Sequence, residues 1–252
     1  MVNEPVRTAL ITGAAGGLGS AIARRLGQNH RLVLTGRAAA LDDLVAELRA
    51  GGVQADGFRL DLADVETTAA AAAQITKQFG RVDVLINNAG GGAVISNGAP
   101  SLNSVTLAEW QRVFAVNLTA PFLLAQAFAP GMQQNGWGRI VNIGSRAGRM
   151  AIKDSEPSYA ASKAGLIGLT RQLAMELSPS GITVNAVAPG KFETTTAVGA
   201  WGNELGRSLA EIPAGRLGQP EEVAELVAYL VSTKAGFVTG ATVDINGGAF
   251  MG

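Results

Sequence analysis

Cysteine is absent from the 252-residue chain, and histidine occurs once, at His30. The lack of cysteine excludes a disulfide framework, a thiolate metal site and a thiol nucleophile, and a single histidine excludes a site built on several imidazoles. We therefore expect no metal site. Lysine plus arginine and aspartate plus glutamate both number 20, so the formal net charge is zero. Because no block of like charge stands out either, we expect no nucleic-acid or anionic membrane partner.

Long hydrophobic runs are missing as well. No segment offers the roughly 18 uninterrupted apolar residues of a membrane span. The N-terminus reaches the run Val6–Ile11 without the basic and apolar regions of a secretory signal. These absences predict a soluble, cytoplasmic protein. Apolar residues nevertheless make up 47% of the chain, which is enough to bury the core of one domain over residues 1–252.

Short apolar runs alternate with longer Ala- and Leu-rich stretches, the pattern of stacked βαβ units. Strands are expected at residues 8–12, 31–35, 54–59, 82–87, 138–143, 182–188 and 242–245, and helices at 17–28, 41–50, 64–79, 107–134, 158–177 and 220–230. Most strand runs are unbroken, as in a parallel sheet covered on both faces. We predict an α/β chain with a single doubly wound Rossmann fold, a seven-stranded parallel sheet and helices on both faces. Pro121 and Pro130 predict a kink or a local end inside the fourth helix.

Two long irregular stretches, residues 91–106 and 191–218, follow expected strand ends. In a doubly wound fold, loops at the carboxyl ends of strands form the ligand crevice. Trp201, Leu205 and Leu209 in the second stretch have helical spacing. They are interpreted either as an apolar lid or as part of an oligomer contact.

A glycine-rich turn, Thr12-Gly-Ala-Ala-Gly-Gly-Leu-Gly19, lies between the first expected strand and the first helix. Glycines there permit a tight turn and a close approach to a pyrophosphate, while the helix N-terminus offers free N–H groups. The alternative is a simple strand-to-helix turn. If the turn binds a dinucleotide, the residues expected to hold it are Gly13, Ala15, Gly16, Leu18 and Gly19.

Residues after the next strands bear on the choice of coenzyme. Arg37 follows the second strand, where an arginine accommodates the 2′-phosphate of NADP and an acid would bind the ribose of NAD. The arginine favours NADP(H), with NAD possible; the alternative is a solvated side chain. Asp61 and Leu62 either border the adenine pocket or belong to a helix cap, for which Asp64 competes. In Asn87-Asn-Ala-Gly90 the two amides serve either to fix strands or to contact ribose.

Tyr159 and Lys163 lie four residues apart in an expected helix, so both side chains point from one face. An unperturbed phenol has a pKa of about 10, and a fixed positive charge nearby favours the phenolate. The pair is therefore a candidate proton-transfer centre in which Lys163 lowers the pKa of Tyr159. The alternative is a surface pair on an amphipathic helix.

Taken together, these motifs resemble the short-chain dehydrogenase/reductase family. The matching features run in the family's order along essentially the whole chain: Gly13/Gly17/Gly19, Asn87-Asn-Ala-Gly90, Asn117, Ser145, Tyr159-x-x-x-Lys163 and Pro189-Gly190. Stretches such as 215–224 and Asn246-Gly-Gly248 are similar to the 3-oxoacyl-carrier-protein reductase-like and sugar or polyol dehydrogenase branches. Two features depart from the reductase pattern: Lys191 stands where an apolar residue is common, and the segment 91–106 looks longer. The lysine bears on the carboxamide contacts and the substrate class, and the longer segment predicts a reshaped substrate mouth.

The resemblance implies a role for each matching residue. Tyr159 is the general acid or base, Ser145 holds the substrate oxygen, and Lys163 assists Tyr159 and binds the nicotinamide ribose. Asn117 holds a water that links Lys163 to solvent; otherwise it stabilises a helix kink. The coenzyme contacts implied further along the chain are Asn88, Ala89, Gly90, Pro189, Gly190, Phe192 and Thr194.

The function predicted is hydride transfer between NADP(H), or NAD(H), and a small-molecule carbonyl or secondary alcohol, with a 3-oxoacyl compound or small ketone favoured. The alternatives are a sugar or polyol dehydrogenase and a catalytically silent dinucleotide-binding regulatory protein. Charges near Ser145, among them Arg146, Arg149 and Lys153, either serve an anionic or polyhydroxylated substrate or belong to a solvated loop. An apolar C-terminal edge strand and the family resemblance together imply a homotetramer.

Overall fold

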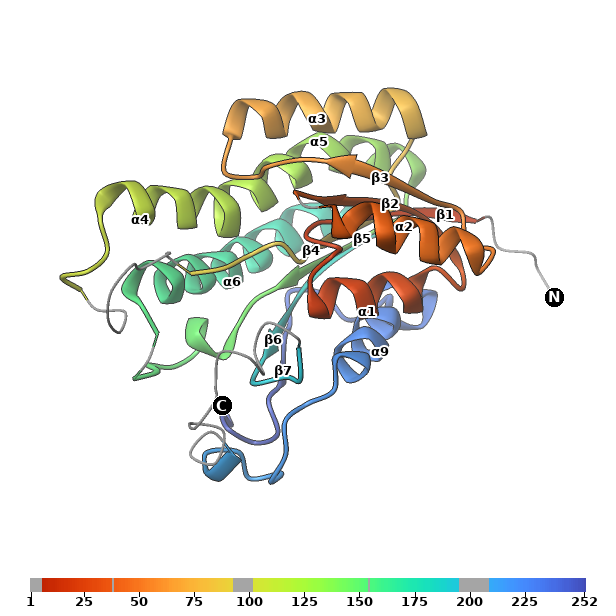
Figure 1. Cartoon of the computed structure of the whole chain (residues 1–252). Coiled ribbons are helices and arrows are strands. Elements are labelled where there is room, and N and C mark those ends of the chain that lie inside the picture. Colours follow the sequence, from red (N-terminus) through yellow and green to blue (C-terminus); the bar gives the residue numbers. More distant parts are fainter. Residues whose placement is uncertain (1–5, 38, 93–101, 154, 195–208) are drawn as a thin grey trace.

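The computed structural model describes residues 6–37, 39–92, 102–153, 155–194 and 209–252. Its centre is one seven-stranded sheet in the order β3-β2-β1-β4-β5-β6-β7, and every neighbouring pair is parallel (Figure 1). The predicted fold class is confirmed. The strands are β1 (Arg7–Ile11), β2 (His30–Gly36), β3 (Ala55–Arg59), β4 (Val84–Asn87), β5 (Gly138–Ile143), β6 (Ile182–Pro189) and β7 (Thr242–Ile245).

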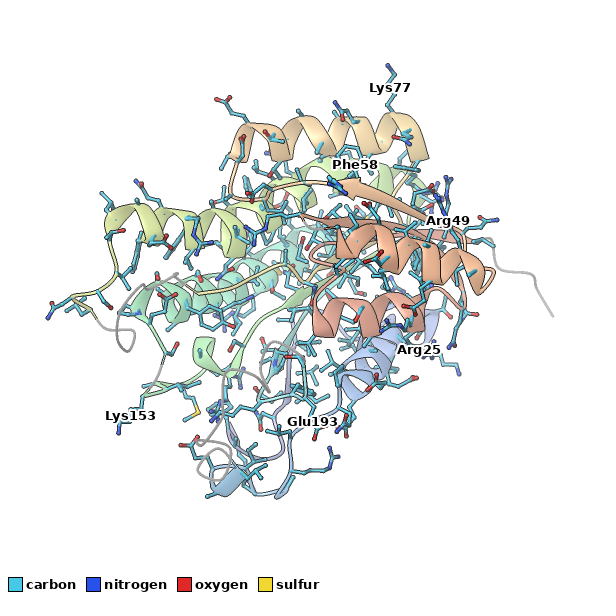
Figure 2. The ribbon with its side chains drawn as sticks, in the orientation of Figure 1. Arg25, Arg49, Phe58, Lys77, Lys153 and Glu193 are labelled. Atoms are coloured by element: carbon cyan, nitrogen blue, oxygen red, sulfur yellow. The ribbon has the colours of Figure 1, made fainter. Side chains whose placement is uncertain are left out.

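Helices cover both faces of this sheet (Figure 1). One face carries α1 (Gly17–Leu26), α2 (Ala40–Ala50) and α9 (Pro220–Val231). The other carries α3 (Val65–Phe79), α4 (Leu107–Phe114), α5 (Ala120–Asn135) and α6 (Pro157–Leu177). Charged side chains point away from these layers, as Lys77 on α3 shows (Figure 2).

The strand sequences explain why two cores form. Along β1, Ala9 and Ile11 pack into the core under α1, α2 and α9, whereas Leu10 packs into the core under α3 and α5. In β2, Val33 faces the second core in the same way. Successive strand side chains point to opposite faces, so an unbroken apolar run supplies both layers. The carboxyl ends of β1 and β4 lie where the strand order reverses, the usual position of a ligand crevice in such sheets.

The fourth predicted helix is interrupted, although not at both prolines. A π-helical turn, Ala115–Thr119, separates α4 from α5 and ends just before Pro121, which has no N–H to donate into the helix. The local end expected at Pro130 does not occur, because α5 continues to Asn135. Pro130 and Gln126, whose carbonyl loses its donor, are both exposed, so water can satisfy that group.

By length and composition alone, the stretch Leu107–Asn135 is apolar enough to cross a membrane, with a mean hydropathy of 1.5. In the structure it packs against α3, α6 and β5. Its side chains Leu124, Phe128 and Met132 are buried in the core on that face of the sheet. The apolar character of the stretch is therefore accounted for by packing within the domain.

Candidate active site

The glycine-rich turn between β1 and α1 leaves no room for side chains. Gly13 has a φ of +61°, and a Cβ at this position would lie 2.8 Å from the Cα of Ala89. A Cβ at Gly19 would lie 2.4 Å from the carbonyl oxygen of Gly13. Gly16 precedes α1 without a side-chain cap. Because the first N–H groups of a helix have no intrahelical partner, the turn has the form of a phosphate cradle.

The amides that follow β4 fix the backbone. Asn87 Nδ2 donates to Asn142 Oδ1 at 2.8 Å and thereby joins β4 to β5. Asn88 Nδ2 donates to the carbonyl oxygens of Thr12 at 2.9 Å and Gly13 at 3.0 Å. Of the two uses that the sequence leaves open for these amides, the structure shows strand and turn fixing. Asn88 also borders the crevice, so the side chain that fixes the phosphate turn lies at the wall of the ligand space.

The crevice at the ends of β1, β2, β3 and β4 is a cavity of about 760 Å³. Many of the residues predicted to bind the coenzyme line it together: Gly13, Ala15, Gly16, Leu18, Gly19, Arg37, Asp61, Leu62, Asn88, Ala89, Gly90 and Thr194. Five others do not belong to its lining: Tyr159, Lys163, Pro189, Gly190 and Phe192. The structure therefore gathers the predicted adenosine and pyrophosphate contacts in one cavity.

Two of the residues outside that lining have structural contacts. The ring of Phe192 is buried in the core, where a Cβ at Gly218 would lie 2.3 Å from its Cε1 atom. Gly190 donates its N–H to the carbonyl oxygen of Ile245 at 2.9 Å, which fixes the turn after β6 against the end of β7. Thr194 does reach the cavity, and a Cβ at Gly17 would lie 2.5 Å from its Cγ2 atom.

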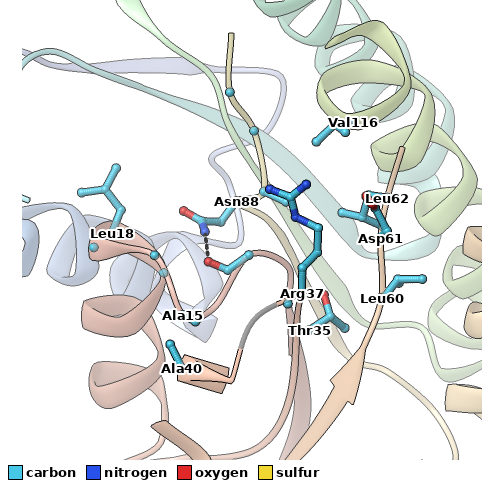
Figure 3. Close-up of a pocket in the computed structure, with 18 of the residues that line it drawn as sticks. Ala15, Leu18, Thr35, Arg37, Ala40, Leu60, Asp61, Leu62, Asn88 and Val116 are labelled. Carbon is cyan, nitrogen blue, oxygen red and sulfur yellow. Dashed lines mark hydrogen bonds between the residues drawn. The ribbon is translucent and has the colours of Figure 1, made fainter. Parts of the chain in front are cut away.

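Arginine side chains border the adenosine end of the cavity. Arg37 extends over it between Asn88 and Asp61 (Figure 3), and within the described ranges no hydrogen bond or ion pair holds its guanidinium. Arg112 also borders the cavity; its Nε donates to Glu109 Oε2 at 3.0 Å and one amino group donates to the carbonyl oxygen of Gly92 at 2.8 Å. Sequence reasoning missed Arg112 because only the packing of α4 brings it there.

Asp61 and Asp64, which follow β3, have different roles: one borders the cavity and the other caps the next helix. Asp64 is the N-cap of α3, where its Oδ1 accepts from the N–H of Thr67 at 3.0 Å. Asp61 accepts from the N–H of Ala63 at 3.1 Å and borders the cavity beside Leu62. Asp61 therefore both shapes the loop and faces the ligand space.

Tyr159 lies in the first turn of α6, and Ser145 lies directly after β5. The hydroxyl of Ser145 lies close enough to that of Tyr159 to favour the phenolate of the tyrosine. Ser145 Oγ also accepts from the N–H of Ala147 at 3.1 Å, so the serine caps the short helical turn Arg146–Gly148 as well. The structure shows the capping interpretation of this serine, and its hydroxyl keeps a proton and a second lone pair for a further partner.

Lys163 lies beneath this pair. Its buried Nζ donates to the carbonyl oxygen of Ile143 at 2.7 Å and lies 5.8 Å from the centre of the Tyr159 ring. A Cβ at Gly90 would lie 2.9 Å from the same nitrogen, so the absence of a side chain at Gly90 lets the ammonium reach the edge of the cavity. The backbone thus leaves a path between Lys163 and the coenzyme space.

Asn117 occupies the π-helical turn and is fully buried. Its Oδ1 accepts from the N–H of Gly91 at 3.0 Å, and its Nδ2 donates to the carbonyl oxygen of Gly91 at 3.1 Å and to Ser162 Oγ at 2.9 Å. The side chain therefore ties the loop after β4 to the helix that carries Tyr159. This places Asn117 in an irregular helical turn, as its kink-stabilising interpretation requires.

The expectation of a lowered pKa at Tyr159 is wrong in this structure. Burial raises the pKa of Tyr159; the interaction with the Ser145 side chain opposes the rise and the negative charge of Glu156 adds to it. Burial also lowers the pKa of Lys163 to about 8. The same packing removes both groups from water and disfavours both charged forms, an effect that sequence spacing does not reveal.

Among the residues that the structure describes, no group of three or more His, Asp or Glu side chains is placed to hold a metal ion. The cavity at the ends of β1 to β4 is lined by glycines, the N-terminus of α1 and Arg37. This lining suits the pyrophosphate and phosphate groups of a dinucleotide.

Comparison with known proteins agrees with this geometry. Residues 13–249 match a family described as Enoyl-(Acyl carrier protein) reductase. The chain is similar to the 3-oxoacyl-[acyl-carrier-protein] reductase FabG of Pseudomonas aeruginosa, with 41% identity over 247 residues, 97% of this chain and 98% of the relative. It belongs to the short-chain dehydrogenase/reductase family. It is an NAD(P)-dependent oxidoreductase that acts on a carbonyl or alcohol group.

Two solved structures are similar over nearly the whole chain. A single-substitution variant of the actinorhodin polyketide ketoreductase, with NADPH, has a TM-score of 0.90 and 37% identity and covers 99% of both chains. A putative NAD(P) dependent gluconate 5-dehydrogenase from Beutenbergia cavernae, with bound NADP, has a TM-score of 0.89 and 36% identity and covers 96% of both chains. Both of these similar proteins hold NADP or NADPH.

Proposed function

We propose that this chain is an NADP(H)-preferring carbonyl reductase in which Tyr159 transfers the proton. The observation that carries the proposal is the approach of the Ser145 and Tyr159 side chains to each other, with the ammonium of Lys163 5.8 Å from the centre of the phenol ring. This group lies at the same sheet edge as the phosphate cradle. NAD(H) remains the alternative coenzyme, and one domain spans residues 1–252.

The lining of the cavity fits a dinucleotide. The turn Gly13–Gly19 and the N-terminus of α1 bind the pyrophosphate, Arg37 binds a 2′-phosphate, and Asp61 and Leu62 border the adenine. Gly90, Pro189, Gly190, Phe192 and Thr194 are assigned to the nicotinamide end together with Lys163. When bound, the coenzyme supplies or accepts a hydride; the chain's own groups position the substrate and move the proton.

In the direction of reduction, the hydroxyls of Ser145 and Tyr159 bind the substrate carbonyl oxygen, and Tyr159 donates its proton to that oxygen. Burial holds the pKa of Tyr159 above its ordinary value, so the phenol carries its proton near neutral pH. Lys163 carries the positive charge that stabilises the resulting phenolate, and its own pKa of about 8 keeps it mainly charged at pH 7. Asn117 joins Gly91 to Ser162 of α6 and so helps to position the helix that carries Tyr159 and Lys163.

A 3-oxoacyl compound or small ketone is the favoured substrate. The similarity to a 3-oxoacyl-[acyl-carrier-protein] reductase and to a polyketide ketoreductase supports this choice. A sugar or polyol dehydrogenase is the second candidate, supported by the similarity to a putative gluconate 5-dehydrogenase. Trp201 and Leu205, assigned from the sequence to an apolar lid or contact, lie outside the described residues, as does most of the 91–106 segment.

The assembly and location that go with this activity are a homotetramer in the cytoplasm, without nucleic-acid or membrane partners. β7 is the edge strand of the sheet, and large apolar side chains such as Phe237 and Met251 are exposed. Such a surface suits a contact with a second copy. A monomer at micromolar concentration in light scattering would rule out the tetramer.

Tyr159→Phe tests the proposal, with a panel of 3-oxoacyl thioesters, small ketones, sugars, polyols and one enoyl thioester assayed with NADPH and NADH. We expect wild-type turnover of a ketone or alcohol. In the variant, kcat should fall by about 100-fold or more, because general acid catalysis contributes roughly that much. NADPH binding, followed by its fluorescence, should persist. Unchanged turnover in Tyr159→Phe would remove the proton-transfer role, and a wild-type chain that binds NADPH but converts nothing would be a silent regulatory protein.

A further inference from the structure

Arg146, which directly follows Ser145, is a buried cation with few partners. Its side chain is 9% exposed. Within the described part of the chain its guanidinium makes no hydrogen bond, and its one ion pair joins it to Glu211 Oε2 across 3.7 Å, beyond hydrogen-bond distance. A guanidinium has five N–H donors in a planar fork. Buried charges are normally paired and hydrogen-bonded, so this group has binding capacity that the protein leaves unused.

The surroundings of Arg146 place it beside the reacting centre. The N–H of Gly144 donates to the carbonyl oxygen of Val187 at 2.7 Å, which sets the carboxyl end of β5 next to that of β6. Lys191 follows β6 closely in the chain, and its Nζ lies 3.4 Å from Glu211 Oε2, the atom that also pairs with Arg146. Arg146 therefore follows the proposed substrate-binding serine in the chain and shares the carboxylate of Glu211 with the lysine that follows the turn assigned to the nicotinamide end. By contrast, Lys153 of the same loop points away from the molecule (Figure 2).

We propose that Arg146 binds an anionic group of the substrate, a carboxylate or a phosphate, with Lys191 adding positive charge and Glu211 acting as the counter-ion that the substrate displaces. The planar fork of arginine suits both anions, because each can accept two parallel hydrogen bonds. The proposal rests on the proposed function, since it takes Ser145 and Tyr159 as the carbonyl site.

The position of Arg146 also restricts the size of the substrate. Arg146 directly follows Ser145, so the Cα atoms of the residue proposed to bind the anion and of the residue proposed to hold the carbonyl oxygen are about 3.8 Å apart. On this proposal the substrate that engages both residues is short, with its anionic group a few bonds from the carbonyl carbon. A short oxo acid, its hydroxy-acid counterpart, or a small phosphorylated ketone has this form, whereas a neutral ketone leaves the guanidinium unsatisfied.

The test compares substrates that differ only in charge. Acetoacetate and levulinate are assayed against their methyl esters for a carboxylate, and dihydroxyacetone phosphate against dihydroxyacetone for a phosphate. The measured quantity is the ratio of kcat/KM for the charged substrate to that for its neutral partner. In Arg146→Gln we expect this ratio to fall at least tenfold for one of the two anion types. A ratio that stays at the wild-type value would overturn the proposal, even if both rates decline.

Arg149→Gln is the matched control. Arg149 belongs to the same loop and the substitution removes the same charge, but its guanidinium is already held by Asp244 at 3.1 Å and by the carbonyl oxygen of Gly252 at 2.6 Å. Its charged-to-neutral ratio should stay within about twofold of wild type. An equal fall in both variants would mean that general loop charge, rather than Arg146, selects the anion.

Two further variants keep the proposal testable if Arg146→Gln does not fold. Arg146→Lys retains the charge without the fork, and we expect an intermediate ratio. Glu211→Gln removes the competing carboxylate, and the ratio should rise severalfold. A ratio that is unchanged or lower in Glu211→Gln would contradict the role of Glu211 as the displaced counter-ion.

A binding measurement separates this proposal from the proposed function. Malonate and inorganic phosphate are titrated into the protein with NADP⁺, and the melting temperature is followed. A rise in wild type and in Arg149→Gln that is lost in Arg146→Gln supports the anion site even if no substrate of the panel is turned over. The absence of any rise with both anions in wild type would overturn it, whether or not neutral ketones are reduced.

Discussion

The proposed coenzyme cavity is shaped chiefly by backbone, whereas the proposed catalytic centre further along the same sheet edge is shaped by buried polar side chains. In the first region, Gly13 and Gly19 allow main-chain atoms to approach where a Cβ would collide. In the second, the hydroxyls of Tyr159 and Ser145 and the ammonium of Lys163 are held within the protein. The first region depends on glycines, which have no side chain, and the second on polar and charged groups whose burial carries a desolvation penalty.

This difference predicts how each region fails. A side chain added to the phosphate turn displaces backbone and therefore disturbs both the fold and the binding site. A charge removed from the catalytic centre relieves a desolvation penalty, so the fold gains while the chemistry is lost. Substitutions in the two regions should therefore differ in their effects on the free energy of unfolding and on coenzyme binding.

The largest effect is expected from Gly19→Ala in the phosphate turn. Its Cβ would lie 2.4 Å from the carbonyl oxygen of Gly13 and 2.9 Å from the Cα of Ala14, and backbone cannot yield as a flexible side chain does. We expect a loss of about 1 to 3 kcal/mol in the free energy of unfolding. The Kd for NADPH should rise by about 100-fold, a free-energy change of roughly 2.7 kcal/mol. Urea unfolding and fluorescence titration measure the two.

Gly168→Ala on α6 is the control for this substitution, because a Cβ there would have no neighbouring atom within 4 Å. It should leave NADPH binding unchanged and stabilise the helix by up to about 1 kcal/mol. If Gly19→Ala binds NADPH as well as the control does, the turn is not built by close backbone approach.

Lys163→Met tests the opposite behaviour in the catalytic centre. Burial lowers the pKa of Lys163 from 10.5 to about 8, so between these values the unfolded chain binds more protons than the folded one. Wild-type stability should therefore gain from this group as pH rises through that window, while below about pH 8 the penalty is fully present. The methionine variant lacks this dependence. The difference in unfolding free energy between the two proteins should move about 2 to 3 kcal/mol in favour of wild type between pH 7 and pH 10.

Urea unfolding of wild type and Lys163→Met at several pH values measures this difference. Titrations shared by both proteins cancel in it. A difference that stays flat from pH 7 to pH 10 would show that Lys163 has an ordinary pKa and that burying it costs the fold little.

The smallest of the three effects is expected from Arg37→Ala at the edge of the coenzyme cavity. If the guanidinium binds a 2′-phosphate, its removal costs a charge-assisted hydrogen bond of about 1.5 to 3 kcal/mol, and the Kd for NADPH should rise tenfold or more. NADH lacks that phosphate, so its Kd should change less than about twofold. Fluorescence titration with both coenzymes decides the matter; equal losses would remove the 2′-phosphate assignment.

Local patterns in the sequence predicted the strands well. Bounds such as Gly138–Ile143 and Thr242–Ile245 agree with the predicted strands residue for residue. The phosphate turn was also predictable, because its form depends on glycines close together in the chain. Arg112 was not predictable as a cavity residue, since its approach depends on the packing of α4 against α6.

The catalytic centre was predicted less completely. Motif order indicated Ser145, Tyr159 and Lys163, and the structure brings them together. Spacing could not give the sign of the pKa shift at Tyr159, because burial depends on every layer packed around the ring. The spacing of residues also could not decide whether the Asn88 amide faces ligand or backbone. The carbonyl groups that it binds belong to Thr12 and Gly13, in the turn after β1 and far away in the chain.

The π-helical turn Ala115–Thr119 changes the direction in which the helical stretch presents its side chains, so that α4 and α5 contact different parts of the protein. Each residue of a helix turns the chain by about 100°, and a π turn holds one residue more than its α-helical equivalent. The inserted residue therefore directs α4 toward α6 while α5 turns Leu124 and Phe128 into the core beneath the sheet. Deleting a single residue here would rotate α4 by about 100° about its own axis and carry Arg112 away from the cavity. A one-residue change of helical phase thus determines whether a whole helix contributes to the coenzyme cavity.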